Sequence, residues 1–240
     1  MIVFHADIVG SLLRPPELLK AQKDLAAAAI TDTQFKEIED RAVDEAITLQ
    51  ESIGLGIVTD GEMRRQSFQS QMTAAVNGFG AFDLDAFLWG VWHDEQGVQR
   101  NRRPRRLGAI AKLERLRYLS AEEFSYLKSK TTRIAKVTLP SPGLWANFWS
   151  PKVSREAYPT LDSFLADIVK ILRDEVKELT RLGATYIQLD APHYGLLLDS
   201  KTRGFYERQG WTLDRWLSMG IDLDNAVMDG FPEVTFGFHL

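Results

Sequence analysis

Five polar or ionisable residues stand directly after apolar runs of the sequence, where their side chains could do chemistry. Ser11 and Glu62 follow the first two runs, Asp190 and His193 follow a later one, and His239 ends the last. The carboxyl ends of parallel strands meet at one edge, and barrel enzymes place their active sites there. Two carboxylates at that edge could bind an ammonium group, and Ser11 with nearby backbone N–H groups could bind a carboxylate. The pattern therefore suggests a pocket for a small zwitterion.

Each of these residues also has a structural explanation. Asp190 stands close before a proline and could cap a turn. Glu62 could be a carboxylate at the start of a helix, where the helix dipole favours a negative charge. Ser11 could cap a turn. His193 could be structural or could donate a proton, and His239 could be a solvated residue near the end of the sequence.

The elements that must position these residues alternate between apolar, β-branched runs and long helical stretches. This alternation predicts βα units around a parallel sheet. We expect six strands, at Ile2–Val9, Ile57–Thr59, Leu107–Leu113, Ala135–Leu139, Tyr186–Leu189 and Val234–Phe238. Two long helices are expected, one from Thr31 to Ile53 with Thr31 as its cap, and one from Leu161 to Leu182 that Gly183 ends.

Residues 63–106 follow this alternation less clearly. They hold several aromatic residues and a basic run from Arg100 to Arg106. We interpret them as a helix followed by an excursion outside the barrel core, which residues 78–106 would form. The basic run is most simply a solvated loop.

The fold class that these elements predict is an incomplete (β/α)₈ TIM barrel within a single domain over residues 1–240. A closed barrel needs about eight strands and typically ~250 residues, so the chain would hold about six of the eight βα units. An open parallel sheet leaves strand edges and apolar helix faces uncovered. We therefore expect missing residues, a partner chain or self-association to complete it.

The composition is that of an ordinary soluble enzyme. The 240 residues are 45% hydrophobic and 26% charged, with a net charge of −4 and no cysteine. The mild acidity argues against a nucleic acid or an anionic membrane as partner. The chain shows neither a signal-peptide layout nor an apolar run of the ~20 residues that span a bilayer, so a cytoplasmic location is expected. Without cysteine, thiolate metal sites and cysteine nucleophiles are excluded within this chain.

Five motifs in a fixed order give a more specific indication. They are His5-Ala-Asp-Ile-Val-Gly-Ser-Leu-Leu-Arg-Pro15, Gly56-Ile-Val-Thr-Asp-Gly-Glu-Met-Arg-Arg65, Lys136-Val-Thr-Leu-Pro-Ser-Pro142, Tyr186-Ile-Gln-Leu-Asp-Ala-Pro192 and Phe236-Gly-Phe-His-Leu240. Together they resemble the catalytic barrel of the cobalamin-independent methionine synthase family, and especially its short single-barrel members. The resemblance implies the barrel fold of the methionine synthase and uroporphyrinogen decarboxylase superfamily.

The resemblance also implies roles for individual residues. Ser11 would hold the carboxylate of homocysteine, and Glu62 and Asp190 its ammonium group. His239 would be the first ligand of a zinc ion that presents the acceptor sulfur as a thiolate. Trp145 and Trp149 lie where the family places an aromatic ring against the pterin of its methyl-folate donor, and packing in the core or at its rim is the alternative for both.

The chain departs from the family pattern at two places. The family's other zinc ligands are a cysteine two positions after the histidine, a later glutamate and a distant second cysteine, whereas this sequence ends at Leu240. The zinc site is therefore expected only in a completed barrel. The family's Asp-Glu-Pro motif reads Asp190-Ala191-Pro192 here, followed by His193. Another alkyl donor or another acceptor thiol is thus a second possibility, as in the related epoxide–coenzyme M transferases.

Three functions follow as hypotheses. The first is a zinc-dependent methyl- or alkyltransferase that acts on a small thiol and resembles 5-methyltetrahydropteroyltriglutamate–homocysteine S-methyltransferase, with Asp190 and His193 as catalytic groups. The second is a catalytically incomplete homologue with at most an amino-acid-binding or assembly role. The third is a metal-independent acid–base lyase of the decarboxylase branch that uses His5, Asp190 and His193.

Overall fold

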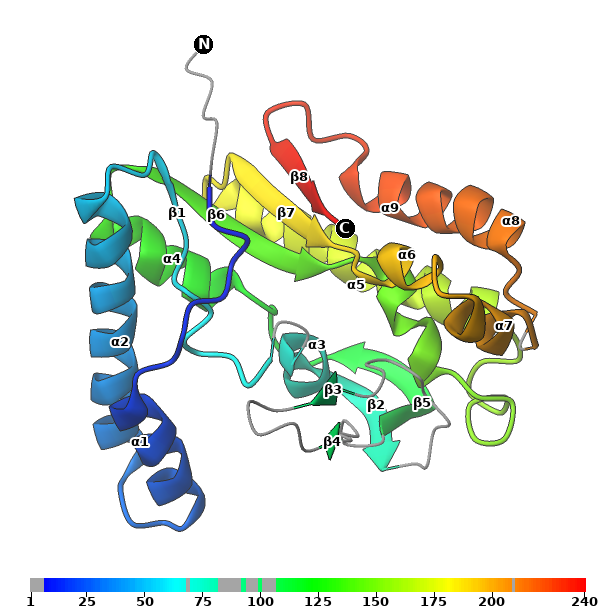
Figure 1. Ribbon diagram of the computed structural model, residues 1–240, viewed down its shortest axis with the longest axis horizontal. Coiled ribbons are helices and arrows are strands. Elements are labelled where there is room, and N and C mark those ends of the chain that lie inside the picture. Colours follow the sequence, from blue (N-terminus) through cyan, green and yellow to red (C-terminus); the bar gives the residue numbers. More distant parts are fainter. Residues whose placement is uncertain (1–6, 68–69, 82–91, 94–98, 101–106, 209) are drawn as a thin grey trace.

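Parallel strands form the central sheet of the protein. The computed structural model describes residues 7–67, 70–81, 92–93, 99–100, 107–208 and 210–240. Its largest sheet has four strands in the order β1-β6-β7-β8 (Figure 1). Their bounds are β1 Ile57–Val58, β6 Ile134–Pro140, β7 Tyr186–Asp190 and β8 Thr235–His239. The register pairs Pro140 with Asp190 and Asp190 with His239, so three strands end side by side.

Four of the expected strands are confirmed, and two expectations need comment. Residues 1–6 lie outside the described part of the chain, and residues 7–9 form no strand. The prediction that Leu107–Leu113 belongs to the barrel sheet was wrong. This segment is β5 (Leu107–Arg115), which pairs antiparallel with β2 (Val76–Ala81) in a separate sheet of two strands. An apolar run predicts a strand but does not choose its partner.

The expected excursion is described only in part. The helix α3 (Ser70–Ala75) leads directly into β2, and the short strands β3 (Trp92–His93) and β4 (Gln99–Arg100) pair antiparallel. The rest of residues 82–106 lies outside the described part of the chain.

Both expected long helices are confirmed, and each begins at a capping box. In α2 (Asp32–Ser52), the Thr31 hydroxyl accepts from the Gln34 amide while the Gln34 side chain accepts from the Thr31 amide. In α5 (Leu161–Arg181), Thr160 and Ser163 do the same. The other helical elements are α1 Pro16–Ala26, α4 Ala121–Lys130, α6 His193–Leu196, α7 Ser200–Arg208, α8 Leu213–Arg215, α9 Ile221–Met228, the 3₁₀ segment η1 Pro142–Phe148 and the π-helical segment η2 Trp216–Gly220. None of the helices in the described residues is long and apolar enough to cross a membrane.

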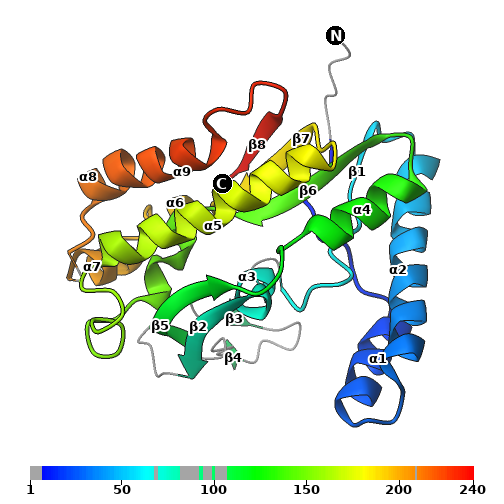
Figure 2. The same cartoon turned by 180° about the vertical axis from the view of Figure 1, so that it is seen from behind.

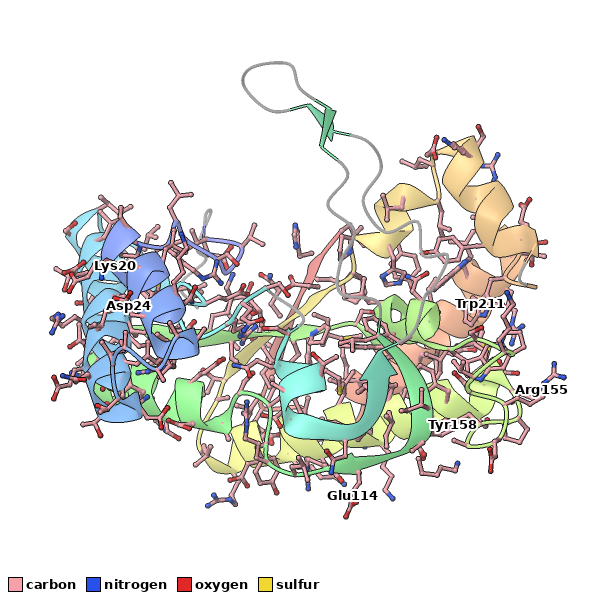
Figure 3. All side chains as sticks on the ribbon, turned by 90° about the horizontal axis from the view of Figure 1, so that it is seen from below. Lys20, Asp24, Glu114, Arg155, Tyr158 and Trp211 are labelled. Carbon is pink, nitrogen blue, oxygen red and sulfur yellow. The ribbon has the colours of Figure 1, made fainter. Side chains whose placement is uncertain are left out.

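The strands β6 and β7 have one apolar and one polar face. Val137, Leu139, Ile187 and Leu189 belong to the main core cluster, together with the apolar residues of α5. Figure 2 shows α5 and α4 covering this side of the sheet. The alternate residues on the other face are polar, and they carry the candidate site. Figure 3 shows Lys20 and Asp24 of helix α1 at one end of the molecule and Trp211 at the other.

The turn after β1 has an unusual backbone. Gly61 and Glu62 both have left-handed φ angles, of 67° and 54°. A non-glycine residue in this region costs roughly 1–3 kcal/mol, so the surroundings must hold it. The Asp60 carboxylate accepts from the Glu62 amide at 2.9 Å, and the Leu12 amide donates to the Gly61 carbonyl at 3.0 Å. The turn therefore directs the Glu62 side chain at the expense of local strain.

A buried carboxylate ties α5 to the start of α4. Glu175 is fully buried, and its two oxygens accept from the backbone amides of Leu119 and Ser120 at 2.7 and 2.8 Å. Leu119 and Ser120 immediately precede α4, so this contact fixes where that helix begins.

We expect Glu175→Gln to lower the free energy of unfolding by about 1–3 kcal/mol, because an amide leaves one buried N–H without an acceptor. Urea unfolding followed by circular dichroism measures the change. Asp174→Asn on the same helix removes only a surface contact to Lys177 and should change stability by less than about 0.5 kcal/mol. Equal stability of the two variants would contradict the proposed role of Glu175.

Asp60 gives the protein a pH-dependent stability. Burial, and then the nearby Glu123 carboxylate, raise the pKa of Asp60 to about 6. The folded chain therefore holds this proton more tightly than the unfolded chain, in which the pKa of aspartate is about 3.9. The resulting stabilisation is complete below about pH 4 and is lost as the pH rises through about 6.

We therefore expect Asp60→Asn to be more stable than the wild type at neutral pH, by about 1–3 kcal/mol. The asparagine oxygen can still accept from Glu62. This advantage should shrink as the pH falls toward about 4. Urea unfolding from pH 4 to 8 measures it, with Glu37→Gln on the exposed side of α2 as a control for the loss of one charge. A difference that does not vary with pH would refute the prediction.

Candidate functional site

The Glu62 carboxylate lies buried at the end of β1, and only 2% of the residue is exposed. Its Oε1 accepts from the Thr138 hydroxyl at 2.7 Å and lies 3.4 Å from Arg65 Nη1. Its Oε2 accepts from the Ser11 hydroxyl. Three segments far apart in sequence therefore converge on this carboxylate.

The N-terminal segment passes directly over Glu62 at Gly10. A Cβ at this position would lie 2.8 Å from Glu62 Oε1 and 2.9 Å from Thr138 Cγ2. Real Cβ atoms essentially never come this close to another heavy atom, so glycine is the residue that allows the approach. The Gly10 carbonyl also accepts from the Thr59 hydroxyl at 2.8 Å.

Arg65 places a positive charge among the carboxylates at this end of the sheet. Its guanidinium is buried and donates to Glu123 Oε2 from Nε at 3.0 Å and from Nη2 at 2.8 Å, and to Thr138 Oγ1 at 2.8 Å. Burial alone lowers the pKa of Arg65, but the carboxylates of Glu123, Glu62 and Asp60 outweigh burial and raise it. The guanidinium remains charged and holds Thr138 in the orientation that serves Glu62.

The second carboxylate belongs to Asp190, at the end of β7. Only 4% of the residue is exposed, and Oδ1 accepts from Gln188 Nε2 at 2.7 Å. Burial raises the pKa of Asp190, and the Glu62 carboxylate raises it further. The two expected carboxylates therefore act on each other electrostatically across the same end of the sheet.

His239 lies beside Asp190 on β8. Its Nδ1 is 3.1 Å from Asp190 Oδ1, and the imidazole is partly exposed. The structure thus brings together four expected site residues in two contacts, Ser11 with Glu62 and Asp190 with His239, which the strand register sets near each other.

His193 lies apart from this group. It is 1% exposed, and neither ring nitrogen has a hydrogen-bond partner in the described part of the chain. Its ring packs between Tyr194 and Trp216, with centroids 4.3 and 5.2 Å away. Burial lowers the pKa of His193 to about 3. The imidazole is therefore neutral at physiological pH. Although His193 follows the Asp190-Ala191-Pro192 turn closely in sequence, it packs among aromatic rings.

Trp149 directly follows the segment η1 and is partly buried. Its indole Nε1 donates to the Tyr158 carbonyl at 3.0 Å, which fixes the orientation of the ring. Its neighbour Trp145 is fully buried and packs 4.7 Å from Phe148, centroid to centroid. Trp145 is thus a core residue, whereas Trp149 is only partly buried and packs against the core cluster.

Four residues that contact the site were not among the expected site residues: Arg65, Lys136, Thr138 and Gln188. Lys136, Thr138 and Gln188 share a signal in the sequence, because they stand at alternate positions of strands that are otherwise apolar. Alternate residues share a face, and a lysine in a buried strand needs partners. Arg65 carries no such signal, since an arginine after a turn is usually exposed.

Comparisons with known proteins agree on one family. Residues 4–221 match the family model for the catalytic domain of cobalamin-independent synthase. A methionine synthase of Pyrococcus abyssi is 34% identical over 191 residues, which are 79% of this chain and 52% of that protein. A 5-methyltetrahydropteroyltriglutamate–homocysteine methyltransferase of Thermosynechococcus vestitus is 28% identical over 214 residues, 89% of this chain and 26% of that protein. The chain spans about half the length of the archaeal methionine synthases that it matches.

The fold is shared with solved structures. The crystal structure of a putative vitamin-B12-independent methionine synthase from Listeria monocytogenes superposes with a TM-score of 0.72 at 20% identity, over 99% of this chain and 65% of that one. The parallel sheet with its helices is therefore an incomplete (β/α)₈ barrel. With residues 4–221 matching the catalytic-domain model, the chain belongs to the cobalamin-independent methionine synthase family.

Proposed function

We propose that this chain binds homocysteine at the ends of β1, β6 and β7, as part of a methyltransferase that methylates the thiol. The observation that carries the proposal is the pair of buried carboxylates, Glu62 and Asp190. Two desolvated carboxylates at the same end of a sheet repel each other, and a cation bound between them offsets this repulsion. An amino-acid ammonium group between them relieves the repulsion and supplies charged hydrogen-bond donors.

Asp190 has an oxygen free for this purpose. Its Oδ1 is engaged with Gln188 and His239, while no hydrogen bond to Oδ2 is made within the described part of the chain. On Glu62, the Ser11 hydroxyl now occupies Oε2. When an ammonium group takes that position, Ser11 can turn its proton toward the ligand carboxylate. The same hydroxyl thus serves the empty and the occupied site.

The methyl donor in this proposal is a methyl-folate, as the name of the Thermosynechococcus relative indicates for that protein. Trp149 is only partly buried, and in this proposal its indole is the flat surface on which the pterin stacks. Transfer forms a bond from the thiolate sulfur to the methyl carbon and breaks the bond from that carbon to nitrogen. The nitrogen keeps the electron pair and takes up a proton.

The described residues offer few donors for the zinc ion that the family resemblance implies. Within the described part of the chain, no group of three or more His, Cys, Asp or Glu side chains could hold a metal ion. His239 offers one imidazole, and its Nδ1 already contacts Asp190. The donors present here do not fit a zinc ion by themselves, and we assign no step of the reaction to it. Amino-acid binding is therefore the activity that this chain's own residues support best.

In the acid–base lyase His193 would give up or take up a proton, but burial lowers its pKa to about 3, which makes the imidazole a weak base, and neither ring nitrogen has a hydrogen-bond partner in the described part of the chain. His5, its other expected base, lies outside the described residues. No observation favours this function over thiol methylation.

We expect Glu62→Gln and Asp190→Asn each to weaken L-homocysteine binding by about 10- to 100-fold, since a hydrogen bond to a charged group contributes about 1.5–3 kcal/mol. Isothermal titration calorimetry measures the affinity, and circular dichroism verifies folding. Asp214→Asn, at an exposed position of α8, is the matched control and should bind like the wild type.

We further expect the wild type to discriminate against 4-mercaptobutanoate, which is homocysteine without its amino group. This analogue should bind at least tenfold more weakly than homocysteine to the wild type, because the carboxylates then lack their cation. In Asp190→Asn the difference between the two ligands should nearly vanish. If the variant and the wild type discriminate equally between the two ligands, Asp190 does not bind the ammonium group.

A further inference from the structure

Lys136 is a buried lysine that the proposed chemistry does not use. Its side chain is 0% exposed, on the polar face of β6. The ammonium group donates to Asp7 Oδ2 at 2.8 Å, to the Ile8 carbonyl and to Gln188 Oε1 at 2.8 Å. An ammonium group has three protons, so Lys136 has one acceptor for each.

The charge of Lys136 determines which way the Gln188 amide points. A lysine can only donate hydrogen bonds, so the amide oxygen of Gln188 must face it. The amide NH₂ then points toward two acceptors, the Val9 carbonyl and Asp190 Oδ1, each at 2.7 Å. A flipped amide would place donor against donor and acceptor against acceptor at all three contacts. The orientation is therefore determined by chemistry alone.

This orientation sets the roles of the two oxygens of Asp190. Oδ1 accepts a hydrogen bond from the Gln188 amide and lies beside His239 Nδ1. The protein itself therefore supplies the partners of this oxygen. Oδ2 is the oxygen left for a ligand. Lys136 therefore reaches the ammonium side of the proposed site through one intervening amide.

The same lysine also holds the carboxylate side. Residues 7–9 form no strand, so no ladder of backbone hydrogen bonds positions them. Instead Lys136 binds Asp7 and the Ile8 carbonyl, and Gln188 binds the Val9 carbonyl. Ser11 stands two residues further along. These side-chain contacts do for the N-terminal segment what pairing does for a strand.

We propose that Lys136, acting through Gln188, is a positioning residue that couples the two halves of the substrate site, Ser11 on the N-terminal segment and Asp190 on β7. The inference rests on the proposed function for the identity of the ligand, whereas the coupling itself exists without ligand. Apolar residues often replace buried ion pairs without loss of stability. Core stability is therefore a poor explanation for a lysine at this position.

The test uses two variants and a control. Lys136→Met keeps the length of the side chain and removes the charge. Gln188→Glu keeps an oxygen for Lys136 and replaces the donor to Asp190 with a second oxygen. Lys130→Met removes a surface lysine that pairs with Asp44 at 2.9 Å and serves as the control. Hydrogen–deuterium exchange of residues 7–12 without ligand reports on the N-terminal segment, and calorimetry reports on homocysteine affinity.

Lys136→Met should accelerate exchange in residues 7–12 and weaken homocysteine binding by about tenfold or more. Gln188→Glu should weaken binding similarly and abolish the preference for homocysteine over 4-mercaptobutanoate. Lys130→Met should match the wild type in both measurements. If Lys136 has only a structural role, Lys136→Met should lower the stability of the protein. Gln188→Glu should then keep the preference for homocysteine over 4-mercaptobutanoate.

Two outcomes separate this inference from the proposed function. If the wild type binds homocysteine and Lys136→Met or Gln188→Glu binds it equally well, the coupling is wrong and the function stands. If the wild type does not bind homocysteine, the function fails, and exchange in residues 7–12 decides the coupling. Unchanged exchange in Lys136→Met overturns it. If that variant does not fold, Gln188→Glu decides through the same two measurements.

Discussion

The parallel register of β6, β7 and β8 is the constraint on which the candidate site depends. It sets Pro140 beside Asp190 and Asp190 beside His239, so the strands end together. Because side chains alternate between the faces of a strand, the same register puts Thr138 level with Gln188 on the polar face. A shift of one residue would turn these polar groups into the apolar core under α5. Burial of the apolar face thus fixes the position of the polar one.

Charge balance on the polar face follows from that arrangement. Two buried cations, Arg65 and Lys136, lie beneath the carboxylates without neutralising them completely. Arg65 is directed mainly at Glu123 and at Thr138, and Lys136 at the N-terminal segment and Gln188. Arg65 approaches Glu62 directly, with Nη1 3.4 Å from Oε1, as well as through Thr138, whereas Lys136 reaches Asp190 through the uncharged Gln188 amide. A cation that paired directly with Asp190 would compete with a ligand ammonium group, whereas one that acts through an amide orients the carboxylate and leaves an oxygen available.

The site also depends on two places where the backbone comes unusually close or adopts an unusual conformation. Gly10 lets the N-terminal segment pass over the Glu62 carboxylate, and the left-handed Glu62 directs its side chain from the turn after β1. Strain of this kind persists only where surrounding contacts hold it. Asp60 supplies one of those contacts, although its own ionisation is unfavourable in the interior. Local stability is thus lower where the site is built, which is common at binding sites.

Periodicity and capping are local properties, so the sequence alone predicted both long helices, the four strands of the parallel sheet and the residues at their ends. Glu62, Asp190 and His239 could be named from motifs at the ends of those strands, and Ser11 from the motif in the N-terminal segment. The fold was needed to show that β5 pairs with β2, that His193 is buried and neutral, and that Lys136 reaches Asp190 through Gln188. Each of these depends on which segment packs against which. Burial, partner choice and hydrogen-bond direction are properties of neighbours in space, which residue spacing along one chain does not specify.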